Sequence, residues 1–214
     1  MTKNLPDFDR VARAYRWLEY ASLGPLLQRT RECHLRLLQC CQRALILGDG
    51  DGRFTARLLA TSPNIQVEAV DISGAMLALL RERCTNFEDR LQTFKLDART
   101  FQPHNPPDVI VTHFFLDCLS QSEVDALIAH LSTQLAPGAL WVVSDFRIPA
   151  GVLHWPAWIY VRALYFAFRV LTGLQITRLP DHAAPLETSG YTRIAVEQKM
   201  FGMLTSEVWE YGKE

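Results

Sequence analysis

Short apolar runs alternate with longer amphipathic segments along the middle of the chain. The runs predict buried β-strands, because they have the length of strands and are bounded by Gly, Pro, Asn and Asp. The segments between them have the spacing of amphipathic helices, including one over 74–84 and one that starts at Ser122 and stops before Pro137. Strands are expected at 44–48, 65–70, 91–96, 108–112 and 139–144. This alternation predicts an α/β fold with a mainly parallel sheet covered by helices on both faces.

The two ends of the chain differ from this pattern. Residues 8–40 read as two or three helices with a break at Gly24–Pro25. After the fifth strand comes a long helical stretch, and then 191–197 and 203–209 predict a terminal antiparallel pair. We therefore expect one domain over 1–214. Its parts are a helical cap (1–42), a core (43–146), a helical insertion (147–190) and terminal strands (191–214).

Composition narrows the class of protein. Apolar residues make up 49% of the 214 residues, enough for a sizeable core. The net charge is -1 and no run of Lys or Arg stands out, which disfavours a nucleic-acid partner. The five cysteines lack metal or disulfide spacing and predict reduced, mostly buried thiols in a cytosolic protein. The first residues lack an apolar signal segment, and no stretch predicts stable membrane insertion.

The first strand leads into a glycine-rich turn. Gly48, Gly50 and Gly52 follow the apolar run directly, and a helix-forming segment follows them. Glycine lets a backbone turn sharply or approach a ligand closely, and α/β sheets bind nucleotide-like ligands at such turns. The dinucleotide fingerprint requires a third glycine where this chain has Arg53, so the turn argues against an NAD site.

Acidic residues end the next two predicted strands. Asp71 lies nineteen positions after Gly52, close to the spacing at which a strand-end acid meets ribose hydroxyls. Ser73 can cap the helix that follows. Asp97 ends the third strand. Three such features at three successive strand ends are more specific than any one of them.

The glycine turn, the string Asp71-Ile72-Ser73-Gly74-Ala75-Met76 and the pair Asp97-Ala98 resemble the class I S-adenosylmethionine-dependent methyltransferases, in particular small-molecule, quinone-type members. The resemblance covers roughly residues 8–211 and implies a seven-stranded sheet with a reversed hairpin strand. It implies S-adenosylmethionine as cofactor, with Asp71 on the ribose and both Met76 and Asp97 at the adenine. The implied cofactor-binding residues are Gly48, Asp49, Gly50, Gly52, Asp71, Ile72, Met76, Asp97, Ala98 and Thr112.

One position departs from the family pattern. Family members carry an acid two positions before the first glycine, and this chain has Ile46 there. Asp49, inside the turn, is the candidate to orient the cofactor's ammonium group instead.

The end of the fourth strand offers a catalytic base. The resemblance places residues after Val111 and Thr112 near the transferable methyl group, so His113 is the candidate base, with Asp117 as a candidate partner. The other role open to His113 is to hydrogen-bond the cofactor or pack beside it. His154 and His182 are second choices. The spacing of acids and histidines predicts no metal site.

Two aromatic segments lie outside the core pattern. Tyr15 or Trp17 could cover the cofactor or be packing residues of the front helices. Trp155–Leu174 is apolar nearly all round, with Arg162 and Arg169 on one side. We expect this segment to cover a lipophilic or aromatic substrate pocket; a homodimer interface and membrane-surface docking are the alternatives.

The sequence thus favours a cytosolic methyltransferase acting on a small, hydrophobic or aromatic acceptor. The alternatives are a non-catalytic protein that binds S-adenosyl ligands or serves as a scaffold, and, less favoured, an NAD-linked oxidoreductase.

Overall fold

The computed structural model describes residues 23, 25–172 and 178–212 and contains one seven-stranded sheet. The strand order is β3-β2-β1-β4-β5-β7-β6, parallel except that β7 runs antiparallel to both β5 and β6. The strands are β1 Arg43–Leu47, β2 Gln66–Asp71, β3 Leu91–Lys95, β4 Val109–His113, β5 Leu140–Phe146, β6 Tyr191–Lys199 and β7 Leu204–Tyr211. The predicted mainly parallel sheet with a reversed hairpin strand is confirmed.

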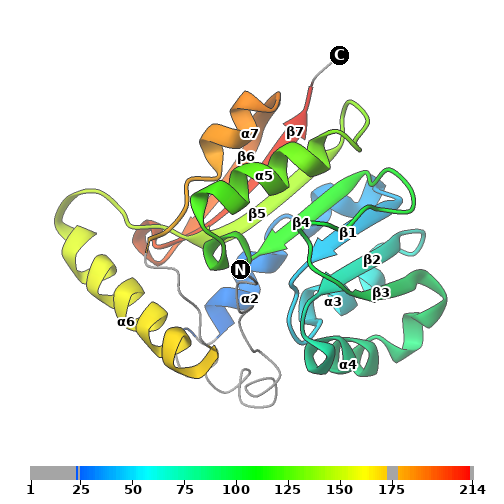
Figure 1. The fold of residues 1–214 in the computed structure, drawn as a ribbon, viewed down its shortest axis with the longest axis horizontal. Helices are drawn as coiled ribbons and strands as arrows, with labels where there is room; N and C mark the ends of the chain where they lie inside the picture. The colour runs from blue at the N-terminus through cyan, green and yellow to red at the C-terminus, as the bar shows by residue number, and fades with distance from the viewer. Residues whose placement is uncertain (1–22, 24, 173–177, 213–214) are drawn as a thin grey trace, which may run out of the picture.

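Helices connect the strands and extend the molecule beyond the sheet (Figure 1). The α-helices are α2 Pro25–Glu32, α3 Arg53–Thr61, α4 Gly74–Arg83, α5 Gln121–Ser132, α6 His154–Thr172 and α7 Ala183–Thr188. Short 3-10 turns are η1 Leu35–Cys40, η2 Thr85–Arg90, η3 Leu116–Cys118, η4 Gly151–Leu153 and η5 Met200–Gly202. Figure 1 shows α6 standing at the side of the molecule opposite α4.

Both faces of the sheet are covered, as the sequence predicts. Alternate residues of β1 point to opposite sides, because side chains alternate along a strand. Ile46 packs into a cluster with Phe54 and Leu58 of α3. Leu45 and Leu47 belong to a second cluster, which includes α5 and α7. Ile46 is therefore a core residue at the position where the family carries an acid.

The parallel strands bring the candidate residues to one edge. β1 pairs with β2 and β4, and β4 pairs with β5, all in parallel. The carboxyl ends of these four strands therefore lie at the same edge of the sheet, where open α/β folds bind ligands. The glycine turn, Asp71, His113 and Asp145 all come from this edge.

Two expectations need correction. Helix α5 begins at Gln121 rather than Ser122, because Ser120 is its N-cap and its N–H donates to the Glu123 carboxylate in a capping box. The cysteines are all free, yet only Cys84 is buried, so the expectation of mostly buried thiols is wrong.

The front helices are described in part. Helix α2 packs on α3 and β7. Leu23 is also helical, so the predicted break at Gly24–Pro25 stays a prediction. Tyr15 and Trp17 lie outside the described residues.

Candidate functional site

The glycine turn has the backbone that the sequence pattern requires. Gly48, Gly50 and Gly52 have φ angles of 66°, 61° and 76°, which L side chains rarely adopt. The Gly48 N–H donates to the carbonyl of Val70 (2.9 Å) and so ties the end of β1 to β2. A Cβ on Gly52 would lie 2.8 Å from the Leu80 Cα, because α4 crosses the turn there. The tight turn is thus fixed by its own packing.

Asp49 serves the local structure of this turn. Its Oδ2 accepts hydrogen bonds from the Thr55 N–H (2.9 Å) and hydroxyl (2.6 Å) in the first turn of α3. Burial raises the pKa of Asp49 to about 6, although the Thr55 hydrogen bonds act against the rise. Its role in orienting an ammonium group stays a prediction.

Asp71 and the start of α4 form the second part of the edge. The Asp71 Oδ1 accepts a hydrogen bond from the Ser73 N–H (2.8 Å). The Ser73 hydroxyl in turn caps α4 by accepting from the Met76 N–H (3.1 Å), which confirms the predicted cap. The Met76 side chain is buried, and Ile72 between them is half-buried. Their contacts with ribose and adenine remain predictions.

Asp97 has a cationic partner that the sequence pattern did not indicate. Arg99 binds both Asp97 oxygens and also reaches Glu123 of α5 (2.5 Å). Hydrogen bonds from Arg99 hold the pKa of Asp97 below its ordinary value. An adenine amino group would share Asp97 with Arg99. Ala98 is buried in the core beside it.

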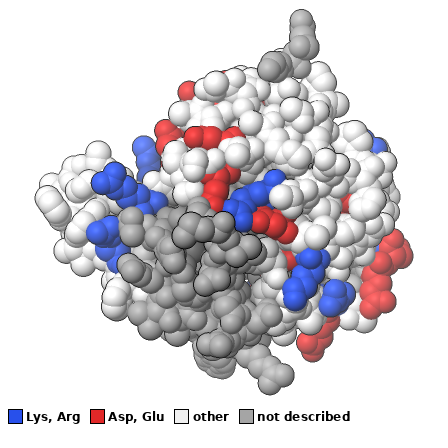
Figure 2. Space-filling model, in the orientation of Figure 1, with Lys and Arg blue, Asp and Glu red and all other residues white. Residues whose placement is uncertain are grey.

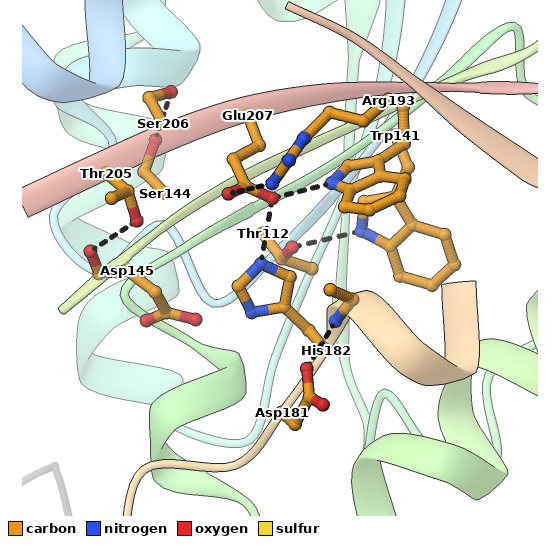
Figure 3. Close-up of polar contacts among 12 residues, drawn as sticks. Thr112, Trp141, Ser144, Asp145, Asp181, His182, Arg193, Thr205, Ser206 and Glu207 are labelled. Carbon is orange, nitrogen blue, oxygen red and sulfur yellow. Dashed lines mark hydrogen bonds and ion pairs between the residues drawn. The ribbon is translucent and has the colours of Figure 1, made fainter. Parts of the chain in front are cut away.

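Thr112 and His113, at the end of β4, are buried. The Thr112 hydroxyl accepts a hydrogen bond from the Trp141 indole (3.0 Å), so this side chain is held in the core (Figure 3). His113 Nδ1 is 2.8 Å from the Ser144 hydroxyl, and its ring packs edge-on against Phe54. Burial lowers the pKa of His113 well below its ordinary value, and the charges of Arg31 and His34 add to this. The His113 Nε2 atom is buried and has no hydrogen-bond partner among the described residues, so the packing role, the contact with the cofactor and the role of base all stay predictions.

Asp117 makes no hydrogen bond with His113, which corrects the expected partnership. Between them Phe114 has a φ of 52°, and η3 follows at once, so the chain turns sharply. Asp117 instead lies near α6, where its carbonyl accepts a hydrogen bond from the Tyr165 hydroxyl (3.1 Å).

A cavity of about 400 Å³ opens beside Asp117. Its polar lining includes Asp117, Asp145, His182, Arg193 and Glu207. Its apolar lining is formed by Phe146, Ile148, Leu179, Pro180 and Ala183. Asp145 and Phe146 are the last residues of β5, so the cavity lies at the carboxyl edge of the sheet, the edge that also carries Asp71.

Two carboxyl groups in the wall of this cavity have raised pKa values. Burial raises the pKa of Asp117 to about 6. Burial, with the charge of Asp117, raises the pKa of Asp145 well above its ordinary value. The Asp145 Oδ1 atom is buried and has no hydrogen-bond partner among residues 23, 25–172 and 178–212.

Glu207, in contrast to Asp117 and Asp145, contacts a cationic side chain and hydrogen-bond donors (Figure 3). It lies 3.3 Å from His182 and 3.1 Å from Arg193, and it accepts a hydrogen bond from the Trp209 indole (3.0 Å). Burial alone would raise the pKa of Glu207, but these partners keep it below the ordinary value. His182 is thus placed at the cavity by its contact with Glu207, whereas His154 is exposed at the start of α6.

Sequence reasoning missed Asp145, Glu207 and Arg99. Asp145 follows the apolar run of the fifth predicted strand, so the strand-end rule that selected Asp71 could have found it. Glu207 lies inside a terminal strand, where the pattern gives no signal.

Helix α6 contacts the body through one narrow face. Ala157, Val161 and Tyr165 are buried at helical spacing, whereas Trp155 (68% exposed) and Phe166 (69%) point outward. Among residues 154–167, whose side chains the structure describes, none lines the cavity. Phe168 and Arg169 have no described side-chain placement.

Two further properties concern metals and membranes. Within the part of the chain that the structure describes, no group of three or more His, Cys, Asp or Glu side chains could hold a metal ion. No helix in that part is both long and apolar enough to cross a bilayer. On the face in Figure 2, Lys and Arg stand in separate small groups with acidic side chains between them.

The fold and the carboxyl edge define a class I methyltransferase fold, and the comparisons with known proteins agree. Residues 44–138 match the family model of the methyltransferase domain. The resemblance to class I S-adenosylmethionine-dependent methyltransferases is confirmed; the quinone-type subgroup stays a prediction.

Among curated proteins, a trans-aconitate 2-methyltransferase of Methylobacterium radiotolerans is 34% identical over half of this chain (50%) and 38% of its own length. A polyamine aminopropyltransferase of Bacillus anthracis is 30% identical over 53% of this chain and 36% of its own length. The chain thus matches little more than a third of each relative.

Among solved structures, the N-methyltransferase NodS of Bradyrhizobium japonicum WM9 superimposes with a TM-score of 0.60 at 15% identity, over 88% of this chain and 98% of that chain. The mitomycin 7-O-methyltransferase MmcR superimposes with a TM-score of 0.71 at 18% identity, over 96% of this chain and 61% of that chain. These likenesses establish the fold.

Proposed function

We propose that the protein transfers a methyl group from S-adenosylmethionine to a small-molecule acceptor. The observation that carries the proposal is the left-handed glycine turn beside Asp71, at the carboxyl edge of a sheet matched by the methyltransferase family model. NodS, which has a similar fold, was also solved in complex with S-adenosyl-L-homocysteine.

The chemistry of the donor set fits this ligand. Asp71 offers carboxylate oxygens to vicinal hydroxyls, and Asp49 offers a carboxylate inside the turn. Met76 is an apolar side chain at the start of α4, suited to the adenine face. Asp97 is held by Arg99, so its contact with adenine is the weakest part of the fit.

The bound ligand supplies a sulfonium methyl group, which is electrophilic without covalent help from the protein. The residues of this chain have to hold the acceptor beside it and exclude water. The cavity lined by Asp117, Asp145 and Phe146 lies at the same sheet edge and is the place we assign to the acceptor.

A methyl-transfer assay tests the proposal. The protein is incubated with methyl-labelled S-adenosylmethionine and small-molecule panels of amines, phenols and carboxylic acids. We expect label in a small-molecule product and release of S-adenosylhomocysteine. Gly50→Val should abolish both, because a β-branched side chain is strained at a φ of 61° and occupies the space of the ligand.

Two results would count against the proposal. Ligand binding without turnover across the panels would favour the non-catalytic alternative. Full binding and turnover by Gly50→Val would mean that the turn does not face the ligand.

A further inference from the structure

We propose that the cavity beside Asp117 takes a small acceptor with a protonatable amine, which is held by the Asp145 carboxyl group. This inference rests on the proposed function and gives it a substrate class. It starts from one orphaned atom at the wall of the cavity.

The Asp145 side chain is only 3% exposed, and its Oδ1 atom has no hydrogen-bond partner among the described residues. The residue lines the cavity, and in Figure 3 its carboxyl group lies on the same side of the β5–β7 pair as His182. Buried polar atoms are nearly always hydrogen-bonded in native proteins. The unmet acceptor therefore points to a hydrogen-bond donor that arrives with a ligand.

The surrounding charges favour a cationic donor. Asp117 and Glu207 both act on Asp145 with like charge. Arg193, the nearby cation in the cavity wall, is engaged by Glu207 and lies over the Trp209 ring. Arg147 also lines the cavity but is exposed. Negative charge thus prevails at Asp145.

The other groups around the two acids compensate them only in part: hydrogen bonds to Asp117, and the Asp117 backbone N–H beside Asp145, act to lower the two pKa values, yet both pKa values stay raised. The Tyr165 hydroxyl donates to the Asp117 carbonyl, and the Cys118 thiol lies 3.5 Å from the Asp117 carboxylate. His182 is paired with Glu207. An ammonium group would supply the missing charge and the missing donors together.

The rest of the lining fits the carbon skeleton of such a molecule. Phe146, Ile148 and Leu179 provide apolar surface beside the acids. An amine on a short apolar skeleton would therefore be complementary to both parts of the wall, and the volume of about 400 Å³ has room for it.

Asp145 would also have a use in the reaction. An acceptor that enters as an ammonium ion gives one proton to the Asp145 carboxylate and so exposes its lone pair. The nitrogen then forms a bond to the methyl carbon while the carbon–sulfur bond breaks and its electron pair stays on sulfur. Asp145 afterwards returns the proton to solvent.

Three matched probes test the inference: 2-phenylethylamine, 2-phenylethanol and phenylacetate, titrated calorimetrically into the full chain at pH 7.5. We expect the amine to bind at least about tenfold more tightly than the other two, since a charge-assisted bond is roughly twice as strong as a neutral one. Its affinity should rise with pH as Asp145 ionises.

Asp145→Asn is the test variant, and Asp89→Asn, the same change at an exposed position of η2, is its control. The test variant should bind the amine at least about tenfold more weakly than the wild type and should bind the alcohol within about twofold of the wild-type affinity. The control should bind the amine within about twofold of the wild-type affinity. The inference is overturned if phenylacetate binds most tightly, if Asp145→Asn leaves amine affinity unchanged, or if no probe binds at millimolar concentration.

These outcomes differ from a failure of the proposed function. S-Adenosylmethionine affinity, measured in the same samples, should be unchanged by Asp145→Asn. Amine binding without S-adenosylmethionine binding would leave the cavity assignment standing and refute methyl transfer.

Discussion

Single carboxylates at the carboxyl edge of the sheet differ in how their charge is balanced. Asp97 and Glu207 have cationic partners and lowered pKa values. Asp117 and Asp145 lie buried near each other, and both pKa values are raised. Ionised Asp97 and Glu207 therefore stabilise the fold. Ionisation of Asp117 and Asp145 lowers the free energy of unfolding, and these two groups are available to a ligand.

Asp145→Asn should raise the free energy of unfolding at pH 8 and have a smaller effect at pH 5. A carboxyl group whose folded pKa is raised binds its proton more tightly in the folded state, so stability falls as the pH rises from the unfolded toward the folded value. Asparagine has nearly the same shape as aspartate but does not ionise, so the variant does not lose stability as the pH rises. Urea unfolding at the two pH values measures it, and an equal effect at both would contradict the account.

At the scale of elements, α6 differs from the other helices because it has a narrow contact with the body. Sequence periodicity predicted its apolar character but not which side would be covered, since aromatic residues occur all round it. The buried face is set by tertiary contacts: Val161 and Tyr165 pack with Cys118, Phe146 and Leu179. A substrate cover, a dimer interface and a membrane-docking surface stay the three predicted roles of the outward face.

Val161→Ala should lower the free energy of unfolding by about 2 kcal/mol, because it removes buried methyl groups. Phe166→Ala, a larger truncation on the outer face of the same helix, should change it by less than about 0.5 kcal/mol. Neither should alter S-adenosylmethionine affinity. Urea unfolding compares them, and a larger loss for Phe166→Ala would mean that the outer face is covered in solution.

At the scale of the whole molecule, the sheet was predictable because its signals are local. Apolar runs gave the strands to within a few residues, and the glycine turn and Asp71 emerged from strand-end positions. The cavity was not predictable, since it joins η3, β5, β6, β7 and the start of α7 across long sequence distances. Arg99 likewise acts through Glu123 on another element. The cytosolic location stays a prediction.

The central claim is that the sheet edge around the glycine turn binds S-adenosylmethionine, with Asp71 on the ribose. Calorimetry on the wild type, Asp71→Ala and the exposed η2 control Asp89→Ala tests it most directly. Loss of two charge-assisted hydrogen bonds should weaken binding to Asp71→Ala by about 2–4 kcal/mol, whereas Asp89→Ala should match the wild type. Unchanged affinity in a folded Asp71→Ala protein, or no binding by the wild type, would contradict the account.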